Sequence, residues 1–229
     1  ETGRRDVAFD AGLRSYMLSV YNYMASGVLL TGIVAMLFAN SQVGIDILVN
    51  GGALRWIIML APLAFVLVLS FGINKLSTGA AQALFWGFAT VMGLSMASIF
   101  LVYTGASIAQ TFFATAAAFA GLSLFGYTTK KDLSGWGTFL IMGVVGLIVA
   151  MLLNAFVFKS GAMELAISAI GVLIFAGLTA YDTQRIKSMY AYVAGTDMMG
   201  KTVIMGALSL YLDFVNMFMF LLRFMGNRS

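Results

Sequence analysis

The chain has 229 residues, of which 61% are hydrophobic and only 10% are charged. A soluble domain needs far more charge to cover its surface, so this composition excludes one and indicates a protein that crosses a membrane several times. The absence of His and Cys excludes the Ser–His dyad of membrane serine proteases, the usual zinc sites and thiol chemistry. The net charge of +4 does not indicate nucleic-acid binding, because the basic residues cluster at the ends of apolar segments.

Seven apolar segments, taken in chain order, are each long enough to cross a bilayer as a helix. A polar, cytoplasmic segment over 1–16 precedes the first span, and a turn-rich loop over 40–53 follows it. No charged residue occurs from Leu76 to Thr129, which is too long for one span, so we expect two spans with a turn at 103–107. Together the spans form a single polytopic membrane domain over 1–229. They are predicted at 17–39, 54–73, 80–102, 108–127, 136–158, 165–183 (or as far as 187) and from 203 onward.

Positive charge predicts the orientation of these spans, because cytoplasmic loops carry an excess of Lys and Arg. With the N-terminus in the cytoplasm, only Arg55 and Lys159 fall in outer loops, each of which also has an acid. Two arrangements of the tail stay open. Seven full spans place Arg223 and Arg228 outside, whereas a re-entrant last segment leaves both termini inside. The inner loops hold the remaining basic residues: Arg4, Arg5, Arg14, Lys75, Lys130, Lys131, Arg185, Lys187 and Lys201.

The last apolar segment carries an aspartate, Asp213, in the middle of an otherwise apolar run. A carboxylate at that depth is expensive unless water or a partner relieves it. Gly206, Ser209, Asp213 and Asn216 are spaced so that they lie on one helix face. Because this polar stripe does not suit lipid, we expect it to face protein or a water-filled cavity.

A second internal carboxylate, Asp182, lies near the inner end of the sixth segment, with Thr179 and Arg185 on its helix face. If Asp182 lies at the membrane interface and pairs with Arg185, its presence needs no functional explanation. Likewise, Asp213 needs none if it is a buried, protonated acid bonded to Ser209 or a neighbouring helix. Consecutive spans run antiparallel, however, so the two aspartates can meet near the inner side. Two close carboxylates share a proton, titrate as a coupled pair and attract a hard cation.

Three motifs are similar to those of one membrane-protein family. Ala-Tyr-Asp-Thr-Gln-Arg-Ile at 180–186, Ala-Leu-Ser-Leu-Tyr-Leu-Asp-Phe-Val-Asn-Met-Phe at 207–218 and Lys-Lys-Asp-Leu-Ser at 130–134 resemble the bacterial branch of the Bax inhibitor family. The resemblance covers essentially the whole chain. It implies an all-α, seven-transmembrane-helix bundle with the last helix central, in the bacterial inner (cytoplasmic) membrane. It also implies a pH-sensitive calcium leak in which Asp182 and Asp213 form the sensor.

We therefore expect a calcium leak channel that is gated by the protonation of an aspartate pair and lined by the last helix. Two carboxylates supply up to four oxygens, so Ca²⁺ binds weakly, which suits permeation better than storage. No cofactor is expected, and Ca²⁺ is the permeant or weakly bound ion. The expected site residues are the sensor and metal pair Asp182 and Asp213, the supporting Ser209, Asn216 and Thr179, and the candidate basic latch residues Arg185 and Lys75.

Two other classes of function stay open. Bacterial relatives suggest a non-conducting membrane regulator that binds a membrane quality-control protease. An intramembrane aspartyl protease is disfavoured, because Asp213 follows Leu-Tyr-Leu rather than Gly-x-Gly and the usual Pro-Ala-Leu element is missing. We expect no enzyme activity. The expected partners are Ca²⁺, protons and the lipid bilayer, with a membrane protease in the regulator alternative and no nucleic acid.

Overall fold

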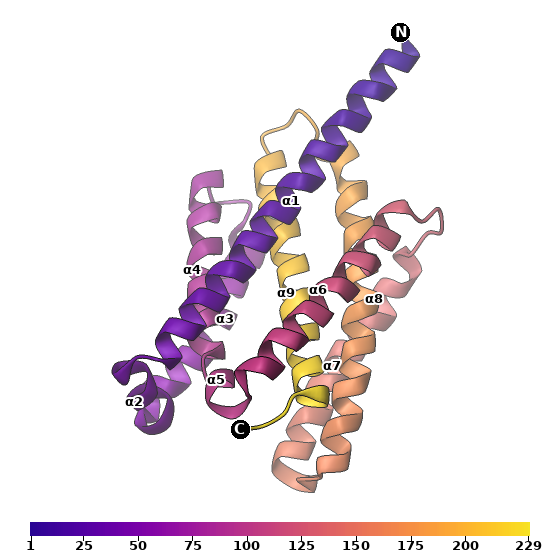
Figure 1. The fold of residues 1–229 in the computed structure, drawn as a ribbon. Helices are drawn as coiled ribbons and strands as arrows, with labels where there is room; N and C mark the ends of the chain where they lie inside the picture. The colour runs from indigo at the N-terminus through magenta and orange to yellow at the C-terminus, as the bar shows by residue number, and fades with distance from the viewer. The chain divides into compact units, whose positions relative to one another are not determined.

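The computed structural model describes residues 1–229, which form helices and turns without a β-strand. Seven of the helices are long and apolar enough to cross a membrane, so the predicted all-α fold with seven spans is confirmed. The chain packs as two compact units, and both α8 (Gly161–Val193) and α9 (Met199–Met225) contribute to each of them (Figure 1). The single domain over the whole chain stays a prediction. Unit 1 comprises Glu1–Tyr103, Met189–Tyr211 and Ser229, and unit 2 comprises Thr104–Ser188 and Leu212–Arg228.

Unit 1 is organised around α4, along which both α1 and α3 pack. Glycine allows the helices to approach closely, as is usual between membrane helices. A Cβ added to Gly93 would lie 2.7 Å from the carbonyl oxygen of Thr31. Similarly, a Cβ added to Gly27 would lie 2.8 Å from the ring of Phe85. The helices that begin and end in this unit are α1 (Thr2–Ala39), α2 (Gln42–Asn50), α3 (Gly52–Gly72), α4 (Thr78–Met96) and α5 (Ile99–Val102).

A buried chain of hydrogen bonds joins three helices of unit 1. The hydroxyls of Tyr211 on α9 and Thr31 on α1 lie 2.5 Å apart, and Thr31 donates to the carbonyl oxygen of Ala89 on α4 at 2.8 Å. Because the Thr31 proton is committed to Ala89, the Tyr211 hydroxyl is the donor toward Thr31. The Tyr211 ring packs edge-on against Phe85 and Phe88. Each hydroxyl is therefore satisfied inside an apolar environment.

Unit 2 contains the α7–α8 hairpin, with α6 packed closely against α8 (Figure 1). A Cβ added to Gly177 on α8 would lie 3.0 Å from Leu140 on α7. At Gly126 on α6 there is no room for any side chain, because a Cβ would overlap the carbonyl oxygen of Ala180 on α8. The elements confined to this unit are α6 (Gly105–Thr128), η1 (Ser134–Trp136), α7 (Gly137–Leu153) and a π-helical turn, η2 (Asn154–Phe158).

The last helix is the most buried of the seven, as expected for a central helix. In its most apolar stretch 72% of the residues are buried, compared with 11–33% in the other spans. Its second half packs on unit 2 through aromatic rings: Phe214 lies 5.6 Å from Phe112 and 5.5 Å from Phe119 on α6. Phe220 stacks on Phe175 of α8 at 5.9 Å. Apolar burial therefore surrounds the segment that carries Asp213.

Two of the helices extend well beyond the predicted spans. The polar segment 1–16 is helical and continues into α1, and α8 runs on to Val193. At 1.5 Å per residue α1 is about 57 Å long and α8 is about 50 Å long, whereas a hydrocarbon core is about 30 Å thick. The polar extensions pack together through Tyr190 of α8, whose ring lies 5.1 Å from Phe9 and 5.2 Å from Tyr16. This aromatic contact buries Tyr16 and Tyr190, whereas Phe9 stays 42% exposed.

The predicted loop over 40–53 is wrong in part, because it contains α2. The hydroxyl oxygen of Ser41 accepts a hydrogen bond from the Gly44 amide at 2.9 Å and caps the start of this helix. The Asn-Gly-Gly sequence forms a turn only at the far end of the 40–53 segment, where Gly52 adopts a φ of +52°. The turn predicted at 103–107 lies where α5 gives way to α6.

The tail lies at the end of unit 2 where α6 and α8 begin. The Thr104 amide donates to the carbonyl oxygen of Asn227 at 3.0 Å, and Nη2 of Arg228 lies 3.5 Å from Oε1 of Glu164. The loop between α6 and η1 is at the opposite end of α6. The second half of α9 therefore ends at the end of unit 2 where α6 and α8 begin, and both arrangements of the tail across the membrane stay predictions.

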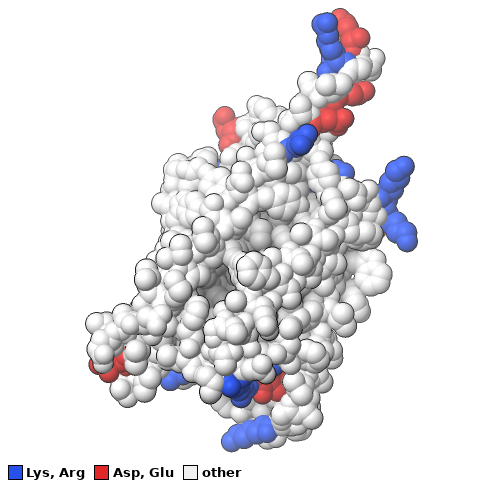
Figure 2. Space-filling view, viewed as in Figure 1, with Lys and Arg blue, Asp and Glu red and all other residues white.

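Apart from the buried Asp182 and Asp213, most charged residues lie outside the apolar stretches of the helices. In the visible face, Lys, Arg, Asp and Glu atoms gather near helix ends, and the middle portions carry none (Figure 2). This distribution fits seven spans that keep their ionised groups out of the hydrocarbon.

The position of the tail can be checked by cysteine labelling, for which the cysteine-free chain provides a clean background. We expect a cysteine at Ser134 and one at Gly226 to react with a membrane-impermeant maleimide from opposite sides of the membrane. With the N-terminus in the cytoplasm, Ser134→Cys reacts from the cytoplasmic side. Reaction of both variants from the same side would contradict the full crossing by α9.

A second prediction concerns the contact between α6 and α8. Gly126→Ala should destabilise the protein by about 1–3 kcal/mol, because the new methyl group forces the two backbones apart. Gly121→Ala on the same helix is the control, since its Cβ would meet nothing within 4 Å and alanine favours a helix. Thermal unfolding in detergent measures both variants. Equal melting temperatures would show that the close approach is absent.

Candidate functional site

The two predicted carboxyl groups lie together in unit 2. Asp182 on α8 is 7% exposed and Asp213 on α9 is 4% exposed, and their side chains are joined by a hydrogen bond. Two ionised carboxylates have no donor between them, so this contact requires one proton on the pair. A carboxyl–carboxyl contact of this kind is favoured when the pair shares one proton.

One oxygen of the pair has no ordinary hydrogen-bond donor beside it. Oδ2 of Asp213 is buried and receives no hydrogen bond from an N–H or hydroxyl group of the protein. Buried polar atoms are nearly always satisfied, and those that are not commonly mark a functional site or a place for water or an ion. The unsatisfied oxygen is therefore the feature of this site that packing alone does not explain.

A single cation stands beside the pair. Nη2 of Arg185, one turn along α8, lies 3.6 Å from Oδ1 of Asp182, and the Arg185 side chain is half exposed. Helix α6, which also packs on this part of α8, has no charged residue. Lys75, the other candidate latch residue, is exposed in the turn after α3 in unit 1. Arg185 is thus the basic residue that the structure pairs with Asp182.

The three supporting residues turn their polar groups to their own helices. The Thr179 hydroxyl donates to the carbonyl oxygen of Phe175 at 2.8 Å. On α9, Ser209 donates to Met205 at 3.1 Å and the amide nitrogen of Asn216 donates to Leu212 at 2.8 Å. Because a carboxylate carries charge and these groups do not, the carboxyl oxygens of the pair are the strongest cation ligands in the stripe.

A small set of contacts positions Asp182 on α8. The hydroxyls of Ser123 on α6 and Thr183 on α8 are 2.8 Å apart. One turn later, Nζ of Lys187 donates to the carbonyl oxygen of Tyr127 at 2.7 Å and lies 4.6 Å from the centre of its ring. These contacts hold α8 against α6 over the turn that follows Asp182.

The loop after α6 is tied to the same turn of α8 by Gln184. Its amide nitrogen donates to the carbonyl oxygen of Lys131 at 2.7 Å, and its amide oxygen accepts from the Leu133 amide at 2.8 Å. Within the loop, Oδ1 of Asp132 accepts from the Ser134 amide at 3.0 Å, which lowers the pKa of Asp132 below its ordinary value. The sequence analysis did not single out Gln184. The sequence did contain a signal for Gln184, because this residue lies in the motif at 180–186 and its two partners lie in the motif at 130–134.

The donor set bears on metal binding. The structure has no group of three or more His, Cys, Asp or Glu side chains that would hold a metal ion. A hard cation such as Ca²⁺ takes six to eight oxygens, of which the pair offers four. The two carboxyl groups alone therefore do not complete the coordination shell of a hard cation.

Comparison with known proteins points to one family. The model of the family described as "Inhibitor of apoptosis-promoting Bax1" matches residues 13–229. The inner membrane protein YbhL of Escherichia coli is 48% identical over 220 residues, covering 95% of this chain and 94% of that protein. An uncharacterized protein of Rickettsia prowazekii is 46% identical over 228 residues, with 99% and 95% covered. An uncharacterized membrane protein of Streptococcus pyogenes is 37% identical over 222 residues, with 96% of each chain covered.

The role of Gln184 can be tested by proteolysis of the loop that it holds. Gln184→Ala removes two hydrogen bonds of about 1 kcal/mol each, so local opening and trypsin cleavage after Lys130 and Lys131 should become at least about tenfold faster. Ser188→Ala is the control, because its hydroxyl bonds only to the Gln184 carbonyl within α8. Equal cleavage rates in both variants would show that Gln184 does not hold the loop.

Proposed function

Because this chain belongs to the Bax inhibitor family of membrane proteins, we propose that it is a pH-sensitive calcium leak of the inner membrane. In this proposal the Asp182–Asp213 pair is the gate and the N-terminus faces the cytoplasm. The single observation that carries the proposal is the buried carboxyl–carboxyl hydrogen bond with one oxygen of Asp213 unsatisfied. Loss of the shared proton leaves two negative charges on the pair, which one Ca²⁺ neutralises.

The protonated pair is the closed state. One shared proton keeps α8 and the second half of α9 together through the carboxyl–carboxyl bond. The guanidinium of Arg185 favours negative charge on Asp182, so we assign the proton to Asp213. An ion pair between a half-exposed Arg185 and Asp182 contributes only about 0–1 kcal/mol, so Arg185 biases the closed state rather than locking it.

Loss of the shared proton opens the path. Two ionised carboxylates in a poorly hydrated interior repel one another until water or a cation enters. The end of α8 is held to α6 and to a loop by directional hydrogen bonds, whereas α9 packs on unit 2 through aromatic rings. Ring contacts tolerate sliding better than hydrogen bonds do, so α9 is the helix that moves in this proposal.

Weak binding is what a leak requires. A site that bound Ca²⁺ with a full set of six to eight protein oxygens would hold the ion and stop its passage. The pair supplies four oxygens, and water completes the shell. The ion therefore enters when the pair is ionised and leaves without a large barrier.

The proposal predicts how Ca²⁺ flux depends on pH. In liposomes that contain the purified protein, flux should rise as pH increases through the second titration of the pair and fall when the proton returns. Asp182→Asn should remove most of this pH dependence, and Asp213→Asn should abolish ion entry at the pair. Asp132→Asn is the control carboxyl, because the lowered pKa of Asp132 keeps it ionised across the range.

Two outcomes would overturn the proposal. Flux equal to that of protein-free vesicles at every pH would favour the non-conducting regulator that binds a membrane protease. An unchanged pH profile in the Asp182→Asn, Asp213→Asn double variant would remove the pair as the gate. A peptide-cleavage assay with the same liposomes tests the expectation that the protein is not an enzyme.

A further inference from the structure

A cavity of about 470 Å³ lies at the end of unit 2 remote from the carboxyl pair, where α7 ends, α8 begins and α9 ends. Its size falls within the range of about 300–1,000 Å³ that is usual for small-molecule sites, and it is far larger than a single ion needs. The proposed leak does not use this cavity. Its charged and polar lining residues are Asn154, Lys159, Ser160, Glu164, Ser168 and Arg223.

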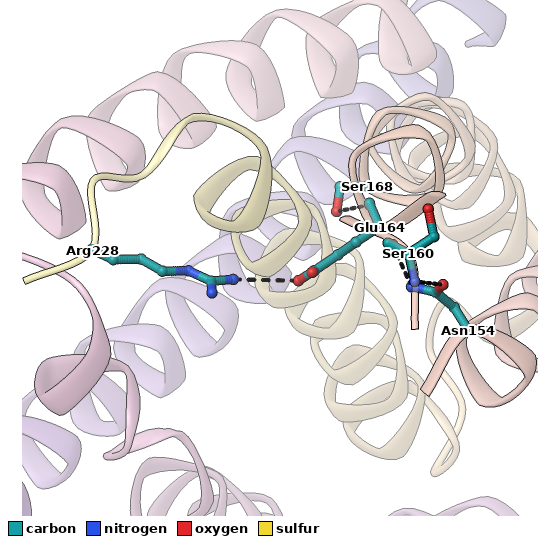
Figure 3. A network of polar contacts seen from close by, with 5 residues as sticks. All are labelled: Asn154, Ser160, Glu164, Ser168 and Arg228. Atoms are coloured by element: carbon teal, nitrogen blue, oxygen red, sulfur yellow. Dashed lines mark hydrogen bonds and ion pairs between the residues drawn. The ribbon is translucent and has the colours of Figure 1, made fainter. Parts of the chain in front are cut away.

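The cavity has an excess of positive charge. Lys159 and Arg223 line it, and Glu164 is the one acid that does so. The Glu164 carboxylate is already engaged, because Nη2 of Arg228 lies 3.5 Å from its Oε1 (Figure 3). With that pair balanced, Lys159 and Arg223 leave a net charge of two, which favours an anionic ligand.

The local backbone conformation places Lys159 at the lining of the cavity. The turn before it is π-helical, and Lys159 itself is the one non-glycine residue with a positive φ, at +47°. The side chain of Asn154 closes the turn: its Nδ2 donates to the carbonyl oxygen of Ser160 at 3.1 Å, and its Oδ1 accepts from the Ser160 amide at 2.9 Å (Figure 3). π-Helical turns and left-handed non-glycine residues concentrate at functional sites, where surrounding contacts maintain them.

The surroundings of the cavity are apolar and exposed. The π-helical turn presents Phe156 at 77% exposure and Val157 at 65%, and the end of α9 presents Phe224 at 52%. In a membrane protein such side chains face acyl chains. A cationic cavity beside them sits where a lipid headgroup adjoins its tails.

We propose that this cavity binds the phosphodiester headgroup of an anionic phospholipid, with Lys159 and Arg223 contacting the phosphate. The planar guanidinium of Arg223 suits two phosphate oxygens, and Lys159 adds a point charge. The start of α8 at Gly161 lines the cavity, and its dipole also favours an anion there. The acyl chains lie over the exposed side chains of η2 and of the end of α9.

The test measures binding of defined lipids to the purified full-length protein in detergent, by native mass spectrometry and by thermal stability. Phosphatidylglycerol should bind one molecule per chain and raise the melting temperature. Phosphatidylcholine with the same acyl chains should bind more weakly, because its headgroup has no net charge. Inorganic phosphate should give neither effect at matched concentration.

Amino-acid substitutions test whether the lipid binds at this cavity. Lys159→Asn suits the left-handed backbone and Arg223→Gln keeps a polar side chain, and each should weaken phosphatidylglycerol binding about tenfold or more. Lys159→Arg should retain binding. The double variant Arg5→Gln, Arg14→Gln, on the exposed face of α1, loses two positive charges elsewhere, one more than each test variant, and should still bind like the wild type. Melting temperatures without lipid show whether each variant is folded.

Three results would overturn the proposal. Equal binding of phosphatidylcholine would show that apolar contact alone attracts lipid. Equal binding to folded Lys159→Asn and Arg223→Gln variants would place the lipid elsewhere on the protein. Stabilisation by inorganic phosphate to the same extent would make the ligand a soluble anion rather than a lipid.

Discussion

Polar groups that are buried in the interior of a membrane protein must find their partners within the protein, because the hydrocarbon offers none. This constraint is most severe at Asp182 and Asp213, where two acids occupy one buried site. Their shared proton lets them coexist. The same constraint explains the neighbouring pairs, Ser123 with Thr183 and Lys187 with the Tyr127 carbonyl, which leave α8 few unsatisfied groups.

The two ends of unit 2 differ in the charged groups that they carry. At the end that carries the pair, two buried acids stand beside one half-exposed arginine. At the other end three basic residues surround Glu164, and the excess is positive whatever the pH near neutrality. Helix α8 contributes to both ends. This 33-residue helix separates the acidic pair from the cationic cavity.

Much of this architecture was accessible from sequence, and the exceptions have physical causes. The seven spans follow from run lengths, because a helix is the simplest way to satisfy the backbone in lipid. The helices of the 40–53 segment and of residues 1–16 were missed. Each depends on packing or capping: Ser41 caps α2, and Phe9 and Tyr16 pack on Tyr190, which is distant in sequence. The arginines of the tail argued against a tail outside the membrane. In the topology with seven full spans, the ion pair between Arg228 and Glu164 balances one of these charges.

By itself, the sequence determined that the chain is a seven-span helical protein with two acids at helix-interior positions, since both conclusions rest on local composition and periodicity. It also contained the motifs on which the family resemblance rests. Only the tertiary structure decided that the two carboxyls share a hydrogen bond, that Arg185 is paired with Asp182 and that one oxygen of Asp213 is unsatisfied. It alone brought Lys159, Glu164 and Arg223 around one cavity. The reason is that distances between side chains on different helices depend on how the helices approach, and Gly126 and Gly177 set that approach through contacts that no local pattern encodes.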